Sequence, residues 1–136
     1  MILWIFYPQC DKFILSNLRR AKKMPFINTK TTATISKEAE TELKTKFGKA
    51  ITCLGKGEQW LMLNFEDKCR MWFKGESDEE LVFVDIALFG KASDAQYDAM
   101  TETVCNIISE TLGIRSDCIY VKYEEVSHWG YNVFNF

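Results

Sequence analysis

The sequence predicts an α/β (α+β) domain of two β-α-β units, in which four strands form one mixed sheet and two helices cover one of its faces. Three observations favour this fold class. Strand-like apolar runs alternate with two long amphipathic stretches, each amphipathic stretch ends at a glycine, and the pattern recurs 58 positions further along the chain. Because a strand, a crossover helix and a parallel strand connect with right-handed geometry, both helices are expected on the same side of the sheet.

The first unit opens with a strand at Phe26 to Thr29 and closes with a strand at Leu61 to Leu63. Ser36 is expected to cap the helix between them, and Gly55 to end it. The apolar face of this helix repeats at spacings of three and four residues: Ala39, Leu43, Phe47, Ala50 and Leu54.

The second unit repeats the first, with strands expected at Leu81 to Phe89 and Ile119 to Val121. Asp94 is expected to cap its helix, and Gly113 to end it. The inward residues of this helix should be Tyr97, Met100, Val104, Ile107, Ile108 and Leu112. A further short strand, Arg70 to Phe73, and a polar turn-like link are expected between the units.

The face of the sheet without helices needs a cover of its own. The run Leu81-Val82-Phe83-Val84 places apolar side chains on both faces of its strand, which is typical of a strand buried on both faces. We therefore expect oligomerisation to bury this face.

Residues 1–23 differ from the rest of the chain and are expected to lie outside the domain, which spans residues 24–136. They carry a net charge of +4, whereas residues 24–136 carry −6. The basic run at residues 19–23 can be encoded by purine-rich codons directly before Met24, as a translated ribosome-binding site would be, which favours a misassigned leader. The alternative is a genuine extension, disordered or touching a membrane surface. Its apolar run is too short to span a bilayer, and its charges follow that run, unlike those of a secretory signal.

Composition excludes several functions. The acidic body has no contiguous basic patch of the kind that nucleic acids require. The chain has one histidine and no CxxC pair, so that no metal site is expected. Dispersed free thiols are typical of a reducing, cytoplasmic location, and the cysteines concerned are Cys10, Cys53, Cys69, Cys105 and Cys118.

Six short motifs follow one another along the domain. They are Met24-Pro25, Gly55-Lys56, Met71-Trp72-Phe73-Lys74-Gly75, Phe89-Gly90-Lys91, Asp117-Cys118-Ile119-Tyr120 and the aromatic ending Trp129 to Phe136. In this order and spacing, Pro25 to Phe136 resembles macrophage migration inhibitory factor and its tautomerase relatives. The resemblance implies a small homotrimer of duplicated β-α-β units, with a catalytic N-terminal proline and no cofactor.

Carried over by position, the resemblance implies a role for six residues. Pro25 is the catalytic base, Lys56 helps to hold the acidic group of the substrate, and the Phe89 backbone contacts the substrate. Tyr120 reaches the pocket from the neighbouring subunit, Tyr131 lies at its rim, and Lys122 replaces a frequent asparagine and adds a second cation. The alignment at Leu88/Phe89 could slip by one residue. Gly57 departs from the usual proline, and Glu79-Glu80-Leu81-Val82 carries no CxxC, so that thiol–disulfide activity is not implied.

The residues alone leave other interpretations open. Lys56 would also complement a helix dipole, and Tyr120 would also suit a core or an interface. Lys122 would also suit a solvated or intersubunit charge, and the aromatic ending would also suit subunit packing.

The chemistry depends on whether Pro25 is the free N-terminus. A proline inside a chain has an amide nitrogen without a proton, whereas a terminal proline is a secondary amine. Burial and a nearby ammonium such as that of Lys56 would lower the pKa of this amine, so that it is neutral near pH 7 and can move a proton beside a carbonyl.

The predicted function is therefore a cofactor-independent keto–enol tautomerase, an isomerase for small aromatic α-keto acids such as phenylpyruvate. The alternative is a cytokine-like protein-binding module with a protein receptor, exported without a signal peptide. A third interpretation is a scaffold whose intact N-terminal extension plugs the pocket.

Overall fold

The computed structural model describes residues 24–135, so that residues 1–23, with Cys10 and the proposed leader, lie outside the described residues. The elements are β1 (Pro25–Thr31), α3 (Lys37–Ala50), η1 (Ile51–Leu54), η2 (Glu58–Trp60), β2 (Met62–Glu66), β3 (Val82–Phe89), α4 (Asp94–Leu112), η3 (Ser116–Cys118), β4 (Ile119–Val126), β5 (Gly130–Tyr131) and β6 (Phe134–Asn135). Among the described residues, no helix has the length and apolar composition needed to cross a bilayer.

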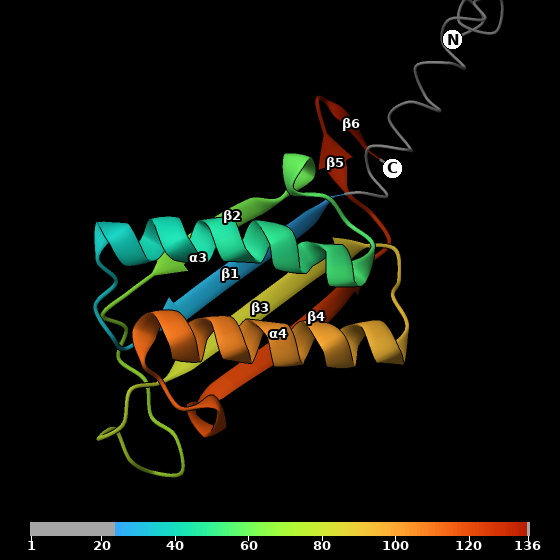
Figure 1. Ribbon diagram of the computed structural model, residues 1–136. Helices are drawn as coiled ribbons and strands as arrows, with labels where there is room; N and C mark the ends of the chain where they lie inside the picture. The colour runs from blue at the N-terminus through green and yellow to red at the C-terminus, as the bar shows by residue number, and fades with distance from the viewer. Residues whose placement is uncertain (1–23, 136) are drawn as a thin grey trace, which may run out of the picture.

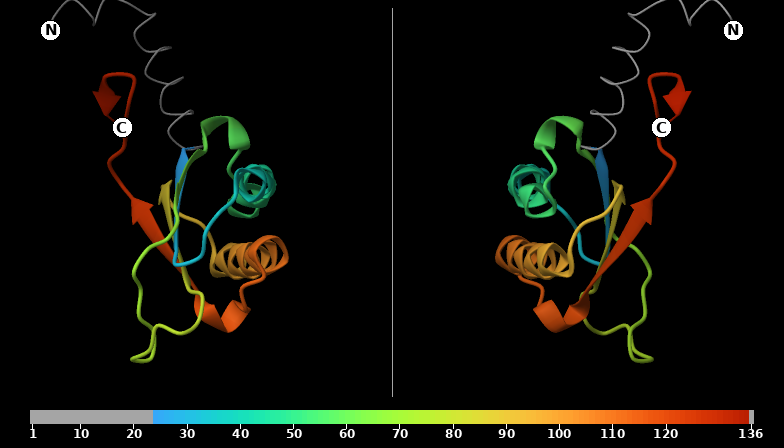
Figure 2. Two further views of the ribbon diagram at one scale, coloured as in Figure 1. Left: turned by 90° about the vertical axis from the view of Figure 1, so that its left-hand side faces the viewer. Right: turned by 90° about the vertical axis from the view of Figure 1, so that its right-hand side faces the viewer.

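The predicted sheet of two β-α-β units is confirmed. The four strands lie in the order β2-β1-β3-β4. β1 pairs parallel with β2, and β3 pairs parallel with β4, whereas the central β1–β3 pair is antiparallel. α3 and α4 lie side by side on one face, and the β5–β6 hairpin extends beyond the sheet (Figures 1 and 2).

Buried and half-buried side chains alternate along β3, and the buried ones form part of the core between the sheet and the helices. Val82, Val84, Ile86 and Leu88 are buried, and the residues between them are half-buried on the opposite face. The helices contribute buried side chains at the predicted positions: Leu43, Phe47, Met100, Val104, Ile107 and Ile108. Each such side chain contributes roughly 1.5–3 kcal/mol when it leaves water, so that this layer holds the helices on the sheet.

The helix ends follow the predicted chemistry, with one correction. Ser36 caps α3, and both Gly55 and Gly113 take the left-handed conformation after the helical segments, at φ 71° and 69°. The cap of α4 is Ser93 instead of Asp94. The Ser93 hydroxyl accepts from the Gln96 N–H at 3.2 Å, and the Gln96 side-chain oxygen accepts from the Ser93 N–H at 2.8 Å. This reciprocal capping box satisfies two backbone donors, which an aspartate one position later does not.

The strand predicted at Arg70 to Phe73 is wrong. Phe73 forms only an isolated bridge with Glu76, and their two backbone hydrogen bonds close a turn through Lys74 and Gly75. Both turn residues have positive φ. The N–H groups of Lys68 and Cys69 donate to the Ala33 and Thr31 carbonyls, but within residues 24–135 no strand continues this pairing through residues 70–72.

The run Leu81 to Val84 is apolar on both faces as predicted, with Phe83 on the open face, but Asp85 interrupts this apolar character on that face. Asn64, Asn28, Asp85 and Lys122 lie in register and form a polar row across all four strands. The Asn64 amide donates to the Asn28 side-chain oxygen at 2.9 Å, and the Lys122 ammonium lies 3.3 Å from the Asp85 carboxylate. Apolar side chains of the open face are found on either side of this row, with Met62 and Phe26 at one end and Phe83 and Tyr120 at the other.

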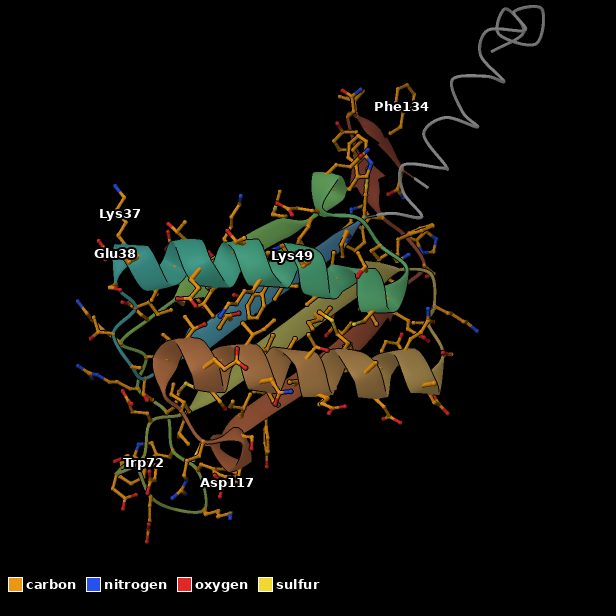
Figure 3. All side chains as sticks on the ribbon, viewed as in Figure 1. Lys37, Glu38, Lys49, Trp72, Asp117 and Phe134 are labelled. Atoms are coloured by element: carbon orange, nitrogen blue, oxygen red, sulfur yellow. The ribbon has the colours of Figure 1, made fainter. Side chains whose placement is uncertain are left out.

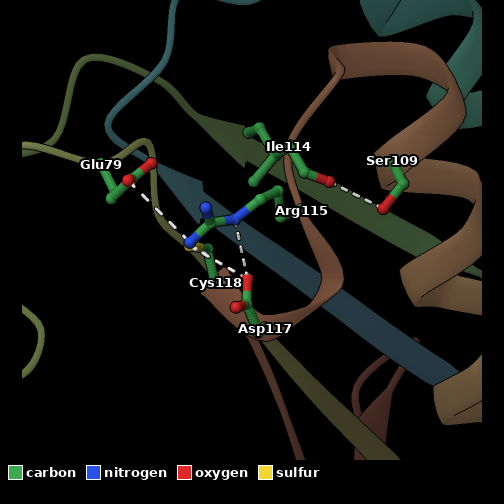
Figure 4. A network of polar contacts seen from close by, with 6 residues as sticks. All are labelled: Glu79, Ser109, Ile114, Arg115, Asp117 and Cys118. Atoms are coloured by element: carbon green, nitrogen blue, oxygen red, sulfur yellow. Dashed lines mark hydrogen bonds and ion pairs between the residues drawn. The ribbon is translucent and has the colours of Figure 1, made fainter.

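A polar network fixes the entry into β4 (Figure 4). The Ser109 hydroxyl donates to the Ile114 carbonyl at 2.7 Å. The Arg115 guanidinium donates to the Asp117 carboxylate at 3.1 Å and lies 3.9 Å from Glu79. These contacts join α4, the link before β3 and the start of β4.

Candidate functional site

Pro25 opens β1 at the edge of the sheet from which the β5–β6 hairpin extends (Figure 1). It is buried and lies opposite Leu88 in the antiparallel pair with β3. Its nitrogen forms the peptide bond with Met24, whose carbonyl accepts from the Phe89 N–H at 3.2 Å. A backbone donor is therefore aimed at the group bonded to the Pro25 nitrogen.

An apolar pocket of about 390 Å³ is lined in part by Met24 and Pro25. Its lining residues are Met24, Pro25, Phe26, Trp60, Met62, Trp129, Gly130 and Tyr131. The Trp60 and Tyr131 rings meet edge to face with centroids 5.5 Å apart, which joins the η2 turn to the hairpin across the pocket. The pocket thus offers flat aromatic walls and few polar groups, as a small aromatic ligand requires.

Trp60 and Met62 are pocket residues that the sequence did not lead us to predict. The β-α-β pattern of the sequence could have indicated that these two residues lie near Pro25. Its two strands run parallel, so that their first residues lie at the same edge of the sheet. The register pairs Phe26 with Met62, which brings the residues around Met62 beside Pro25.

Lys56 reaches the same edge from the segment after Gly55. Its ammonium donates to the Phe89 carbonyl at 3.1 Å, and burial lowers the pKa of Lys56 from its ordinary value of 10.5. Phe89 therefore presents its N–H to Met24 and its carbonyl to Lys56. The structure brings together Pro25, Lys56 and Phe89, three of the residues predicted for the site, and Tyr131 completes the wall of the adjoining pocket.

Tyr120 and Lys122 lie elsewhere in the same chain. Tyr120 pairs with Phe83, five residues before the Leu88 that faces Pro25, which corresponds to roughly 17 Å along the strand. Lys122 forms ion pairs with Glu124 at 3.1 Å and Asp85 at 3.3 Å, and these carboxylates raise its pKa. Neither side chain lies near the Pro25 of its own chain.

Tyr120 stands in a second apolar cleft, of about 220 Å³, at the opposite end of the sheet. Its ring meets the Phe73 ring edge to face at 5.2 Å, and its side chain is 57% exposed. Trp72, 72% exposed, also lines this cleft. Trp72 and Phe134, the latter on β6, point outward at opposite ends of the molecule (Figure 3).

Comparisons with known proteins agree with this architecture. The sequence profile of the family described as "Macrophage migration inhibitory factor (MIF)" matches residues 24–133. Curated proteins provide no match. The structure of MIF2 from Leishmania major is 29% identical, with a TM-score of 0.77, and the match covers 83% of this chain and 97% of that one.

Two further solved structures extend the comparison. A macrophage migration inhibitory factor homologue from Prochlorococcus marinus is 27% identical, with a TM-score of 0.74 over 82% of this chain and 98% of the other. A protein described as a fused 4-OT wild type symmetric trimer is 14% identical, with a TM-score of 0.68 over 74% of this chain and 85% of the other. This last likeness concerns the fold alone.

Proposed function

The chain belongs to the macrophage migration inhibitory factor family, and from that premise we propose that it is a cofactor-independent keto–enol tautomerase for small aromatic α-keto acids. The Pro25 nitrogen acts as general base once residues 1–24 are absent. One observation carries the proposal: the Phe89 N–H is bonded to the Met24 carbonyl, next to the Pro25 nitrogen. Removal of Met24 leaves a secondary amine beside an N–H donor without its partner.

The charges around this position suit an acid. The Lys56 ammonium donates to the carbonyl of Phe89, the same residue whose N–H would lose its partner with Met24. The ammonium would attract the carboxylate of an α-keto acid and stabilise negative charge on the enolate. It also disfavours protonation of the Pro25 amine, which keeps the base neutral near pH 7.

The reaction then needs only groups of the chain itself. The Pro25 nitrogen removes a proton from the carbon beside the keto group, the electrons of the C–H bond form the C=C bond, and the π electrons of the carbonyl move onto the keto oxygen, which then takes a proton to give the enol. The resulting prolinium returns a proton to complete the isomerisation. A neutral amine within hydrogen-bonding distance is the requirement for this general base catalysis.

The aromatic lining predicts a preference among keto acids. We expect a chain that begins at Pro25 to accelerate the exchange of C3 protons for deuterium, relative to the uncatalysed exchange followed by NMR, much more for phenylpyruvate than for 2-oxobutanoate. Trp60→Leu should reduce this preference about tenfold because an aromatic contact is lost, while the rate with 2-oxobutanoate changes little. A folded chain that begins at Pro25 and catalyses no exchange would overturn the proposed activity and leave protein binding as the alternative.

We also propose that the active assembly is a homotrimer in which each pocket receives Tyr120 from a neighbouring copy. The open face supports a head-to-tail arrangement, since its apolar side chains lie at opposite ends and a polar row separates them. Such heterologous contacts form closed rings when the rotation between copies closes. The fused 4-OT protein of the same fold is described as a symmetric trimer.

Subunit mixing tests the shared pocket. Pro25→Gly and Tyr120→Ala, both in chains that begin at residue 25, should each have low activity alone. Mixed assemblies, formed by refolding the two variants together, should regain activity, because some pockets then combine an intact Pro25 with an intact Tyr120. A Tyr120→Ala protein with full activity, or a mixture no more active than the sum of its parts, would contradict the shared pocket.

A further inference from the structure

The segment from Gly55 to Leu61 carries two site residues, Lys56 and Trp60. Between them lies Glu58, which does not line the pocket and contacts the helix layer instead. Lys56 points to the end of β3, and Trp60 points to Tyr131 on the hairpin. Glu58, two residues from each, turns toward α3 and lies 3.7 Å from the Lys44 ammonium. The segment therefore contacts three different elements, and Glu58 provides its contact with the helix layer.

Gly48 of α3 makes room for this contact. A Cβ at position 48 would collide with the Glu58 carboxyl group. Gly48 has no positive φ, so that its backbone conformation does not require glycine. Glycine inside a helix also disfavours the helix relative to alanine, which makes the space for Glu58 the physical reason for a glycine here.

We propose that Glu58, seated against Gly48, is a positioning residue that holds the η2 turn so that Lys56 and Trp60 flank Pro25. This role rests on the proposed tautomerase function. The fit of the Glu58 side chain against Gly48 contributes more to the position of the turn than the ion pair between Glu58 and Lys44. Both side chains are about half exposed, and an ion pair at such a surface adds little stability. The Glu58 carboxyl group lies against the helix at Gly48, and a Cβ at this position would force the Glu58 side chain to move.

A double-mutant cycle tests the contact between Glu58 and Gly48. It compares four chains that begin at Pro25: the parent, Gly48→Ala, Glu58→Ala and the double variant. Each single change should raise KM for phenylpyruvate about three- to tenfold with a smaller fall in kcat, since Lys56 and Trp60 hold the substrate while Pro25, which moves the proton, stays in place. In the double variant, the alanine side chain at position 48 no longer meets a carboxyl group. The KM of the double variant should therefore match that of Glu58→Ala, and its Tm should exceed that of Glu58→Ala because alanine favours the helix.

Two further variants separate shape from charge. Glu58→Gln keeps the shape and should retain the parent KM, and Lys44→Met should do the same. The proposal is overturned if Glu58→Ala leaves KM unchanged, if Glu58→Gln behaves like Glu58→Ala, or if the effects of Gly48→Ala and Glu58→Ala on KM multiply.

The Tm values distinguish a failure of this proposal from a failure of the proposed function. If the effects of Gly48→Ala and Glu58→Ala on Tm are non-additive but KM is unchanged, the two residues are in contact and this contact does not position the site. The tautomerase function would then stand. A parent that folds but has no activity would overturn both the function and the positioning role, whatever the Tm values show.

Discussion

The full chain of 136 residues, its mass verified, is expected to show at least a thousandfold lower tautomerase activity than a chain that begins at Pro25. Two losses combine. An amide nitrogen cannot act as a base, and general base catalysis alone contributes about 10²- to 10⁴-fold. The Met24 carbonyl also occupies the Phe89 N–H, which the substrate would otherwise use. The measurement is ketonisation of enol-phenylpyruvate, followed by ultraviolet absorbance.

A third protein separates these two losses. Pro25→Gly in a chain that begins at residue 25 keeps a terminal amine, although a primary one, and leaves the Phe89 N–H free. It should bind phenylpyruvate nearly as well as the Pro25 chain, by calorimetry, while its turnover falls. The full chain should fail to bind as well as to turn over. Equal binding by the full chain and the Pro25 chain would show that the Met24 carbonyl does not block the site.

The same comparison bears on the alternatives left open by the sequence. If full activity persists in a verified full chain, Pro25 is not the base and the resemblance has misled the assignment. If activity appears only after residues 1–24 are removed, the residues before Pro25 act as a block on a preformed site. Met24 is itself 4% exposed and lines the pocket, as such a block requires.

Local sequence patterns were sufficient to predict most of the fold. Glycine at a helix end, serine before an amphipathic stretch and alternation along a strand each report on a few neighbouring residues, and the structure follows them at Gly55, Gly113 and Ser36. The error at Asp94 arose between two adjacent residues that can both cap. Gln96, placed to answer Ser93 and not Asp94, was the sequence signal that decides between them.

Register explains what the sequence could not show. The polar row on the open face exists because Asn64, Asn28 and Asp85 fall opposite one another across three strands, and a slip of one residue would break it. The proximity of Trp60 to Pro25 depends on the parallel register of β1 and β2 in the same way. The resemblance, in contrast, named Lys56 and Phe89 from motifs at the ends of elements, and the two residues lie in contact, while their roles toward a substrate stay predictions.

Lys56→Met, in a chain that begins at Pro25, is expected to raise KM for phenylpyruvate about 10- to 100-fold. A hydrogen bond from an ammonium to a carboxylate contributes about 1.5–3 kcal/mol, and the loss of this bond corresponds to that range. Lys49→Met is the matched control. Lys49 lies in the last turn of α3, where a lysine complements the helix dipole, so that equal effects of the two changes would favour the dipole interpretation of Lys56.

The pH dependence gives the second half of this test. Burial lowers the pKa of Lys56, so that its ammonium is lost at a lower pH than that of an exposed lysine. Since kcat/KM reports groups of the free enzyme, its value should fall as pH rises through this lowered pKa. Lys56→Arg keeps the charge at every accessible pH and should move this fall toward more alkaline pH. If the alkaline limb is the same in Lys56→Arg and the parent, the limb belongs to another group, and Lys56 does not hold the acid through its charge.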